Sequence, residues 1–149
     1  MTATVTSTTN SVPTSPASAV TGFRNTLPFA IVTVASVLAG LIHYAVVPEH
    51  RSEWVVYAVF FTLLGAFQLI WAATVWIARR RPVLLVGALV NAVAIGLWIV
   101  TRTVGLPFGP EAGEAEAVGL IDVLCVLAEA VVLVTAVAAL WVSIRRRTT

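Results

Sequence analysis

Residues 54–81 read WVVYAVFFTLLGAFQLIWAATVWIARRR, in which 25 residues without a charge are followed by three arginines. An α-helix rises about 1.5 Å per residue, so an apolar run of about 20 residues matches the thickness of the hydrocarbon core of a bilayer. Adjacent arginines are typical of the cytoplasmic end of such a span. This stretch therefore predicts a transmembrane helix that ends at the cytoplasmic side.

Composition extends the prediction to the rest of the chain. Of the 149 residues, 59% are hydrophobic and only 11% are charged, whereas soluble domains carry about 25% charged residues. Three further apolar runs are long enough to cross a bilayer. The predicted spans are about 27–47, 54–78, 83–102 and 118–143, joined by PEHRSE, RRRP and TVGLPFGPEAGEAEA. The predicted fold is all-α, a four-helix transmembrane bundle over residues 27–149.

The segment before the first span has a different composition. As far as Gly22 it is mostly Thr, Ser, Ala and Pro, with no charge and no apolar periodicity. Such a segment buries too little surface to offset the entropy of ordering it. We expect residues 1–26 to form a disordered cytoplasmic tail. The apolar run that follows is too long for the h-region of a signal peptide, so we expect it to be retained as the first span.

Charge distribution predicts the orientation of the spans. Arginines concentrate in cytoplasmic loops. One side of the predicted bundle holds Arg24, Arg79, Arg80, Arg81, Arg145, Arg146 and Arg147, and the other holds Arg51 and Arg102. The second side also holds Glu49, Glu53, Glu111, Glu114, Glu116 and Asp122. We therefore predict a multi-pass plasma-membrane protein with both termini cytoplasmic and the histidine- and acid-bearing loops outside.

Polar and small residues recur on one face of each predicted helix. These rows are Thr33, Ser36, Gly40 and His43; Tyr57, Gly65 and Gln68; Gly87, Asn91, Trp98 and Arg102; and Asp122, Cys125 and Glu129. Hydrocarbon disfavours such groups, so the four faces should turn toward protein or trapped water. Close packing through small residues and interhelical hydrogen bonds would explain the rows without any ligand.

Three polar residues, Gln68, Asn91 and Glu129, fall near the middle of the predicted bilayer. An ionisable side chain at that depth is a functional-site hypothesis by default. The alternative is that Glu129 is protonated and structural, with a hydrogen bond to Asn91 or Gln68. Cys125 lies one turn from Glu129 and is the single cysteine of the chain, so no CxxC motif or intrachain disulfide exists.

Imidazole and carboxylate groups gather near the predicted outer ends of the spans, and these are ligands for Zn²⁺, Fe²⁺, Mn²⁺ or Cu²⁺. The candidate metal ligands are His43, His50 and Asp122, although their spacing matches no strong metal motif. The other candidate polar-site residues are Glu49, Gln68, Asn91, Arg102, Cys125 and Glu129. Alternatively, the histidines make ordinary hydrogen bonds and Arg102 pairs with Asp122.

Several segments carry a family resemblance: IHYAVVPEH, EW, AFQLIWA and GALVNAVAIGLWIVTRTVGLPFGPEAGEAEAVGLID. They resemble an uncharacterised family of small four-span bacterial integral membrane proteins. The resemblance covers about residues 40–130. It implies the four-helix architecture and carries no activity, catalytic residue or cofactor.

The sequence favours an integral membrane protein with a polar, outward-opening site for a divalent transition metal or another cation. The competing interpretation is a structural or accessory subunit of a larger membrane complex. A third is an oxidoreductase with a bound metal or a quinone pocket at His43, Trp98 and Arg102, although no nucleophile–base pair or dinucleotide fingerprint supports an enzyme. The expected partners are lipid and a homo-oligomer or larger complex, not nucleic acid.

Overall fold

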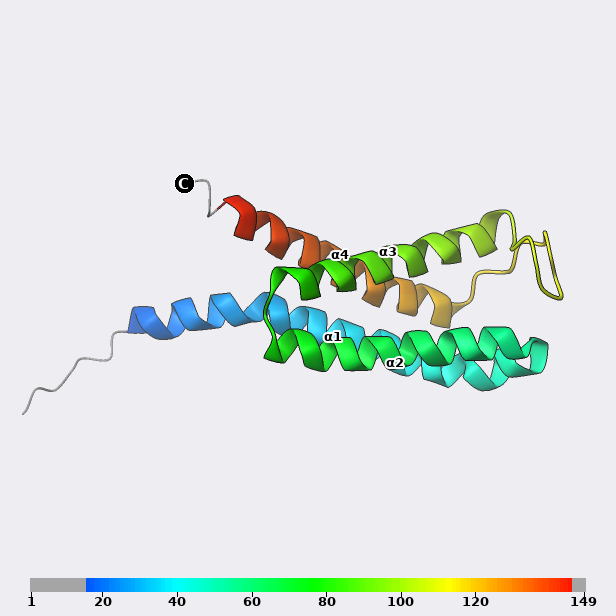
Figure 1. Ribbon diagram of the computed structural model, residues 1–149, viewed down its shortest axis with the longest axis horizontal. Helices are drawn as coiled ribbons and strands as arrows, with labels where there is room; N and C mark the ends of the chain where they lie inside the picture. The colour runs from blue at the N-terminus through cyan, green and yellow to red at the C-terminus, as the bar shows by residue number, and fades with distance from the viewer. Residues whose placement is uncertain (1–15, 146–149) are drawn as a thin grey trace, which may run out of the picture.

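The computed structural model describes residues 16–145, with side chains from Thr26 onward. This part of the chain is all-helical, as predicted. Its four helices are α1 (Pro16–Glu53), α2 (Val55–Ile77), α3 (Arg81–Thr103) and α4 (Leu120–Arg145) (Figure 1). Each is long and apolar enough to cross a membrane. The bounds of α2, α3 and α4 lie within two residues of the predicted spans.

Helix α1 continues through the predicted connection PEHRSE, so the prediction of a loop at residues 48–53 was wrong. Pro48 removes one backbone donor, but local side-chain contacts support the last turn. Ser52 Oγ donates to the Glu49 carbonyl at 2.6 Å, and His50 Nδ1 lies 2.8 Å from Glu53 Oε2. A single extended residue, Trp54, then connects α1 to α2.

The start of α1 also differs from the prediction. The helix begins at Pro16 rather than near Leu27, so residues 16–26 of the predicted tail are helical, and residues 1–15 lie outside the described residues. Proline is favoured in the first turn of a helix, where its missing N–H would have had no partner. Pro82 likewise lies in the first turn of α3 rather than in the connection before it.

The helices pack side by side in the order α2, α1, α4, α3. Helices α2 and α3 contact each other little, and chiefly near the connection between them at residues 78–80. We call the end of the bundle that carries this connection the arginine end. There Trp71 Nε1 donates to the Val83 carbonyl at 2.8 Å. From this contact α2 and α3 diverge toward the opposite end, which carries residues 104–119 and which we call the loop end (Figure 1).

The interior and the surface have the polarity expected for a lipid environment. The larger hydrophobic core lies toward the arginine end and includes Trp71, Val75 and Val132. Toward the loop end the interior also contains buried polar side chains such as His43 and Glu129, while large apolar side chains cover the outside; Leu63, for example, is 65% exposed. Because hydrocarbon solvates such side chains well, this surface is compatible with a multi-pass membrane protein.

Candidate functional site

The polar rows predicted from the sequence turn inward. The buried polar residues among those described are Ser36, His43, Gln68, Asn91 and Glu129, and none of these residues is more than 5% exposed. They come from all four helices, with Ser36 and His43 on α1 and one each on the other three. The inward orientation of the rows, as a geometric prediction, is therefore confirmed.

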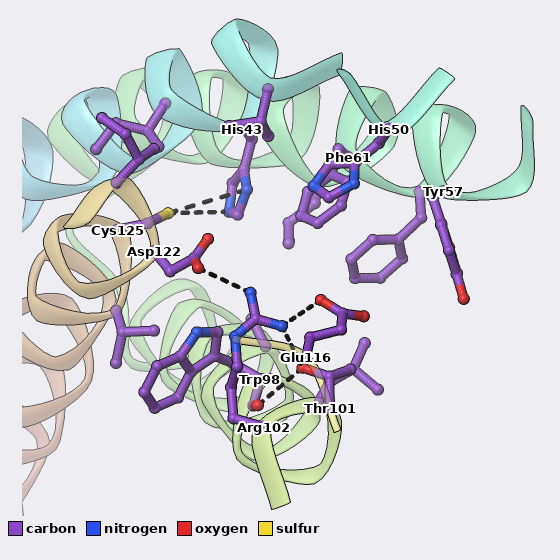
Figure 2. Close-up of a pocket in the computed structure, with 18 of the residues that line it drawn as sticks. His43, His50, Tyr57, Phe61, Trp98, Thr101, Arg102, Glu116, Asp122 and Cys125 are labelled. Atoms are coloured by element: carbon purple, nitrogen blue, oxygen red, sulfur yellow. Dashed lines mark hydrogen bonds and ion pairs between the residues drawn. The ribbon is translucent and has the colours of Figure 1, made fainter. Parts of the chain in front are cut away.

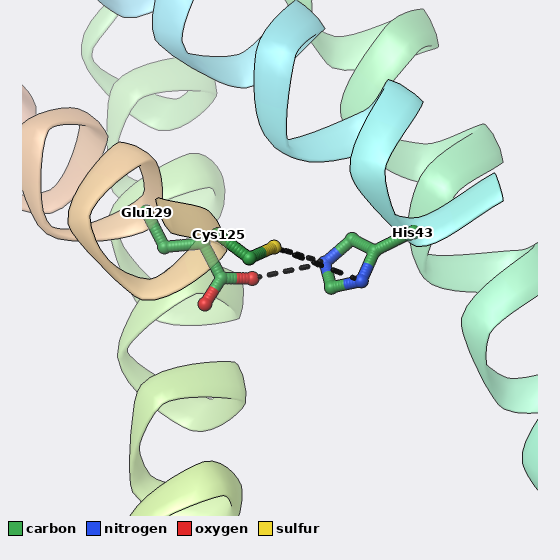
Figure 3. Close-up of side chains that lie close together, drawn as sticks. All are labelled: His43, Cys125 and Glu129. Carbon is green, nitrogen blue, oxygen red and sulfur yellow. Dashed lines mark hydrogen bonds and ion pairs between the residues drawn. The ribbon is translucent and has the colours of Figure 1, made fainter. Parts of the chain in front are cut away.

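Three side chains from α1 and α4 form a compact group in this interior (Figure 3). His43 Nε2 lies 3.1 Å from Glu129 Oε1 and 3.6 Å from Cys125 Sγ. All three residues are buried, and their nearest ligand atoms lie within 4.8 Å of one another. Cys125 and Glu129 meet because four residues separate them along α4, which places both on one helical face.

Two of the three separations within this group are close to those around a tetrahedral metal ion. Metal–nitrogen and metal–oxygen bonds of about 2.0 Å and a metal–sulfur bond of about 2.3 Å put nitrogen about 3.3 Å from oxygen and about 3.5 Å from sulfur. The observed values are 3.1 and 3.6 Å. These two separations are therefore compatible with a shared ion, and equally with direct hydrogen bonds between the side chains.

A second layer of hydrogen bonds holds Glu129 in place. Gln68 Nε2 donates to Glu129 Oε1 at 3.2 Å, and Ser36 Oγ donates to the backbone carbonyl of Gln68 at 2.9 Å. These bonds tie helix α2 to both α1 and α4. Asn91 Nδ2 instead donates to the Gly87 carbonyl of its own helix at 2.8 Å. Of the two predicted partners of Glu129, the structure places Gln68 in contact.

A separate ionic cluster ties the ends of α3 and α4 together. Arg102 Nη2 donates to Asp122 Oδ2 at 2.8 Å, and Arg102 Nη1 donates to Glu116 in the long connection. Asp122 Oδ2 also accepts the Gly119 N–H at 2.9 Å, which holds the start of α4. The alternative expectation of an Arg102–Asp122 pair is thus what the structure contains.

The three predicted ligands His43, His50 and Asp122 are not brought together. Because α1 stays helical to Glu53, seven residues put His43 and His50 about 10 Å apart along its axis. His50 pairs with Glu53 and stacks on Phe61, with ring centroids 4.2 Å apart. Asp122 is engaged by Arg102. Another candidate, Glu49, is exposed.

A cavity of about 310 Å³ connects the buried group to the ionic cluster (Figure 2). Glu129, Cys125 and His43 line it deep in the interior, and Arg102 and Phe108 line it at the loop end. Its remaining walls are mainly apolar and aromatic, which is typical of ligand sites in proteins. Most of the candidate polar residues therefore line the same cavity.

Sequence reasoning missed two contributors to this region. Glu116 lies in the acidic stretch of the third connection, and nothing in its spacing distinguishes it from Glu111 and Glu114. Phe61, which stacks on His50 and lies 5.5 Å from the ring of His43, is one of several aromatic residues in an apolar span. Only the helix arrangement reveals the roles of these two side chains.

The fold and site together define a helical protein with four membrane-span-capable helices and a buried His–Cys–Glu group. Comparison with protein-family models, curated proteins and solved structures finds no match. The chemistry of the site residues themselves therefore has to indicate the function.

Proposed function

We propose that the chain is a four-helix transmembrane bundle of the plasma membrane with both termini in the cytoplasm. The arginine end would face the cytoplasm, because arginines concentrate on that side of membranes. Two of its arginines lie over aromatic rings: Arg79 is 4.9 Å from the Trp76 ring and Arg145 is 3.6 Å from the Trp141 ring. Arginine and tryptophan side by side are typical of the membrane–water interface. The acidic loop end would then lie outside.

Within this bundle, the group of His43, Cys125 and Glu129 is proposed to bind a transition-metal cation. The convergence of these three ligand types on one buried point carries the proposal. A thiolate disfavours Mg²⁺ and Ca²⁺, and one sulfur combined with nitrogen and oxygen suits a borderline-soft ion such as Zn²⁺. Three protein ligands leave a fourth position, as in zinc sites that bind a further ligand.

The proposed ion would enter from the loop end. The cavity that reaches the group from that end supports this direction, and the nearby excess of carboxylates attracts cations. In the sequence, no acid, histidine or lysine lies beyond Glu129 toward the arginine end. A binding site open to the outside therefore fits better than a path through the membrane.

The test is metal binding by the full-length protein in detergent. We expect about one Zn²⁺ per chain after dialysis against buffered zinc, measured by elemental analysis. Cys125→Ser and Glu129→Gln should lower zinc affinity by about 100-fold or more, because each removes a ligand. With Co²⁺, the wild type should show a sulfur-to-cobalt charge-transfer band in the near ultraviolet, and Cys125→Ser should lack it.

His50→Ala is the matched control, since His50 lines the same cavity outside the three-residue group. It should keep full zinc binding, and circular dichroism should show that each variant keeps its helices. Wild-type protein that stays metal-free at saturating zinc would overturn the proposal. That result, combined with co-purification of a partner complex, would favour the accessory-subunit interpretation.

A further inference from the structure

The cavity reaches the side of the molecule between α2 and α3. These helices touch near Trp71 and then diverge, and the cavity lies where they are apart, lined by Phe60 of α2 and Ala94 of α3. Phe60 is 38% exposed, so this wall borders the outer surface. In a bilayer such a surface faces hydrocarbon. A ligand that enters the cavity between α2 and α3 would therefore come from the lipid phase. This inference rests on the membrane insertion proposed above.

Two hydrogen-bond donors in the cavity wall have no acceptor. Trp98 Nε1 and Arg102 Nε are buried, and neither makes a hydrogen bond to any described residue. Both residues line the cavity. A buried donor without an acceptor is uncommon in proteins and calls for an explanation, and a bound ligand is one.

The nearby carboxylates do not satisfy these two donors. Asp122 accepts hydrogen bonds from Arg102 Nη2 and Gly119, and Glu116 accepts one from Arg102 Nη1. Two carboxylates surround this single guanidinium, so an anionic headgroup would be repelled. The wall therefore suits a neutral molecule that brings acceptor oxygens.

The shape of the wall suits a flat ring. Figure 2 shows His43 and Phe61 on one side of the pocket and Trp98 and Arg102 on the other. The imidazole of His43 provides a further polar edge opposite the two spare donors, and the surrounding apolar side chains suit a ring and a hydrocarbon tail. A ring with a carbonyl oxygen on one edge could accept hydrogen bonds from Trp98 and Arg102, while its opposite edge lies toward His43.

We propose that this cavity binds a neutral quinone from the bilayer. One carbonyl oxygen accepts hydrogen bonds from Trp98 and Arg102, the other faces His43, and the hydrocarbon tail leaves between α2 and α3. The cavity volume of about 310 Å³ is within the range of small-molecule sites.

The test measures binding of a radiolabelled benzoquinone with a decyl tail to the protein in lipid nanodiscs. Trp98→Phe keeps the aromatic ring but removes the N–H, and it should weaken binding about tenfold, the effect of one hydrogen bond. Ala94→Trp should abolish binding by filling the cavity. Trp141→Phe is the matched control on the outer surface, where Trp141 is 54% exposed, and it should bind like the wild type.

Two competitors of similar tail length decide the chemistry. Decylbenzene lacks the carbonyl oxygens, and decyltrimethylammonium carries a positive charge. The proposal requires that neither displaces the quinone at equal concentration. Displacement by decylbenzene would mean that the cavity selects only for apolarity, and displacement by the ammonium compound would mean that it selects a cation. Unchanged quinone affinity in Trp98→Phe would also overturn the proposal.

Metal and quinone binding separate through two variants. Cys125→Ser should lose zinc but keep the quinone, because the sulfur lies outside the set of spare donors. Trp98→Phe should lose quinone affinity but keep zinc. Absence of zinc binding in the wild type with quinone binding intact would refute only the metal proposal, and the reverse pattern would refute only the quinone proposal.

Discussion

His43 Nε2 lies 3.1 Å from Glu129 Oε1, although 86 residues separate the two along the chain. Both side chains are almost fully buried, with relative exposures of 7% and 2%. Removing two such polar groups from water costs about as much free energy as their mutual attraction provides. Apolar residues at the same two positions would therefore often make the fold equally stable. A buried pair of this kind suggests a role beyond holding α1 against α4.

This relationship predicts a non-additive effect of substitution on stability. Glu129→Leu alone leaves His43 and Gln68 without their shared acceptor and should lower the free energy of unfolding by about 2–4 kcal/mol. The double variant His43→Leu/Glu129→Leu should recover more than half of that loss, because the histidine no longer lacks a partner. Reversible unfolding in mixed micelles measures both values. Strictly additive losses would show that the two side chains are energetically independent.

A second prediction concerns the contact between α2 and α3. A Cβ atom added at Gly87 would lie 2.0 Å from the Trp71 ring. The ring is buried and its N–H is held by the Val83 carbonyl, so it cannot move away freely. Gly87→Ala should therefore lower the free energy of unfolding by about 1–3 kcal/mol through overpacking.

Gly96 provides the matched control on the same helix. A Cβ added there meets nothing within 4 Å, and alanine favours helix over glycine by about 1 kcal/mol. Gly96→Ala should be neutral or stabilising in the same unfolding assay. If the two variants behave alike, the Trp71–Gly87 contact contributes nothing to stability.

The helical architecture was predictable because bilayer thickness fixes the length of an apolar run. The turn between α1 and α2 was not, because Pro48 and the charged residues after it are equally typical of a loop. The pairing of His50 with Glu53, which supports the last helical turn, depends on side-chain geometry that hydropathy does not contain. Because this last turn extends α1 to Glu53, only Trp54 remains to connect α1 to α2.

The inward faces were also predictable, because hydrocarbon leaves polar groups few other places to point. The sequence did not allow us to predict which of these inward side chains contact one another. His43 meets Cys125 and Glu129 because α1 packs against α4, whereas the described residues of α1 and α3 do not pack against each other. The order of the helices around the bundle and their axial register decide such pairs, and the sequence rows are compatible with several orders.

A third prediction isolates the supporting role of Gln68 in the proposed metal site. Gln68→Leu removes the hydrogen bond to Glu129 Oε1 without removing a ligand. Loss of such an outer hydrogen bond lowers metal affinity about 10–100-fold in other sites, and we expect a decrease of that size in a zinc competition titration. Asn91→Leu is the control, because this equally buried amide contacts the Gly87 carbonyl instead. Equal decreases in both variants would point to a general loss of packing.

The last prediction concerns sidedness, on which the direction of metal entry depends. Replacing Cys125 by serine leaves no other cysteine in the chain, so a cysteine introduced elsewhere reports its own position. Ala112→Cys places the thiol in the exposed connection at the loop end, and Ala78→Cys places it at the arginine end. A membrane-impermeant maleimide added to intact cells should label the first and not the second. Detergent lysis should make both reactive, which controls for thiol accessibility. Labelling of Ala78→Cys alone in intact cells would show that the topology is the reverse of the proposed one. The cavity mouth would then open to the cytoplasm, where the metal supply and the redox conditions for Cys125 differ.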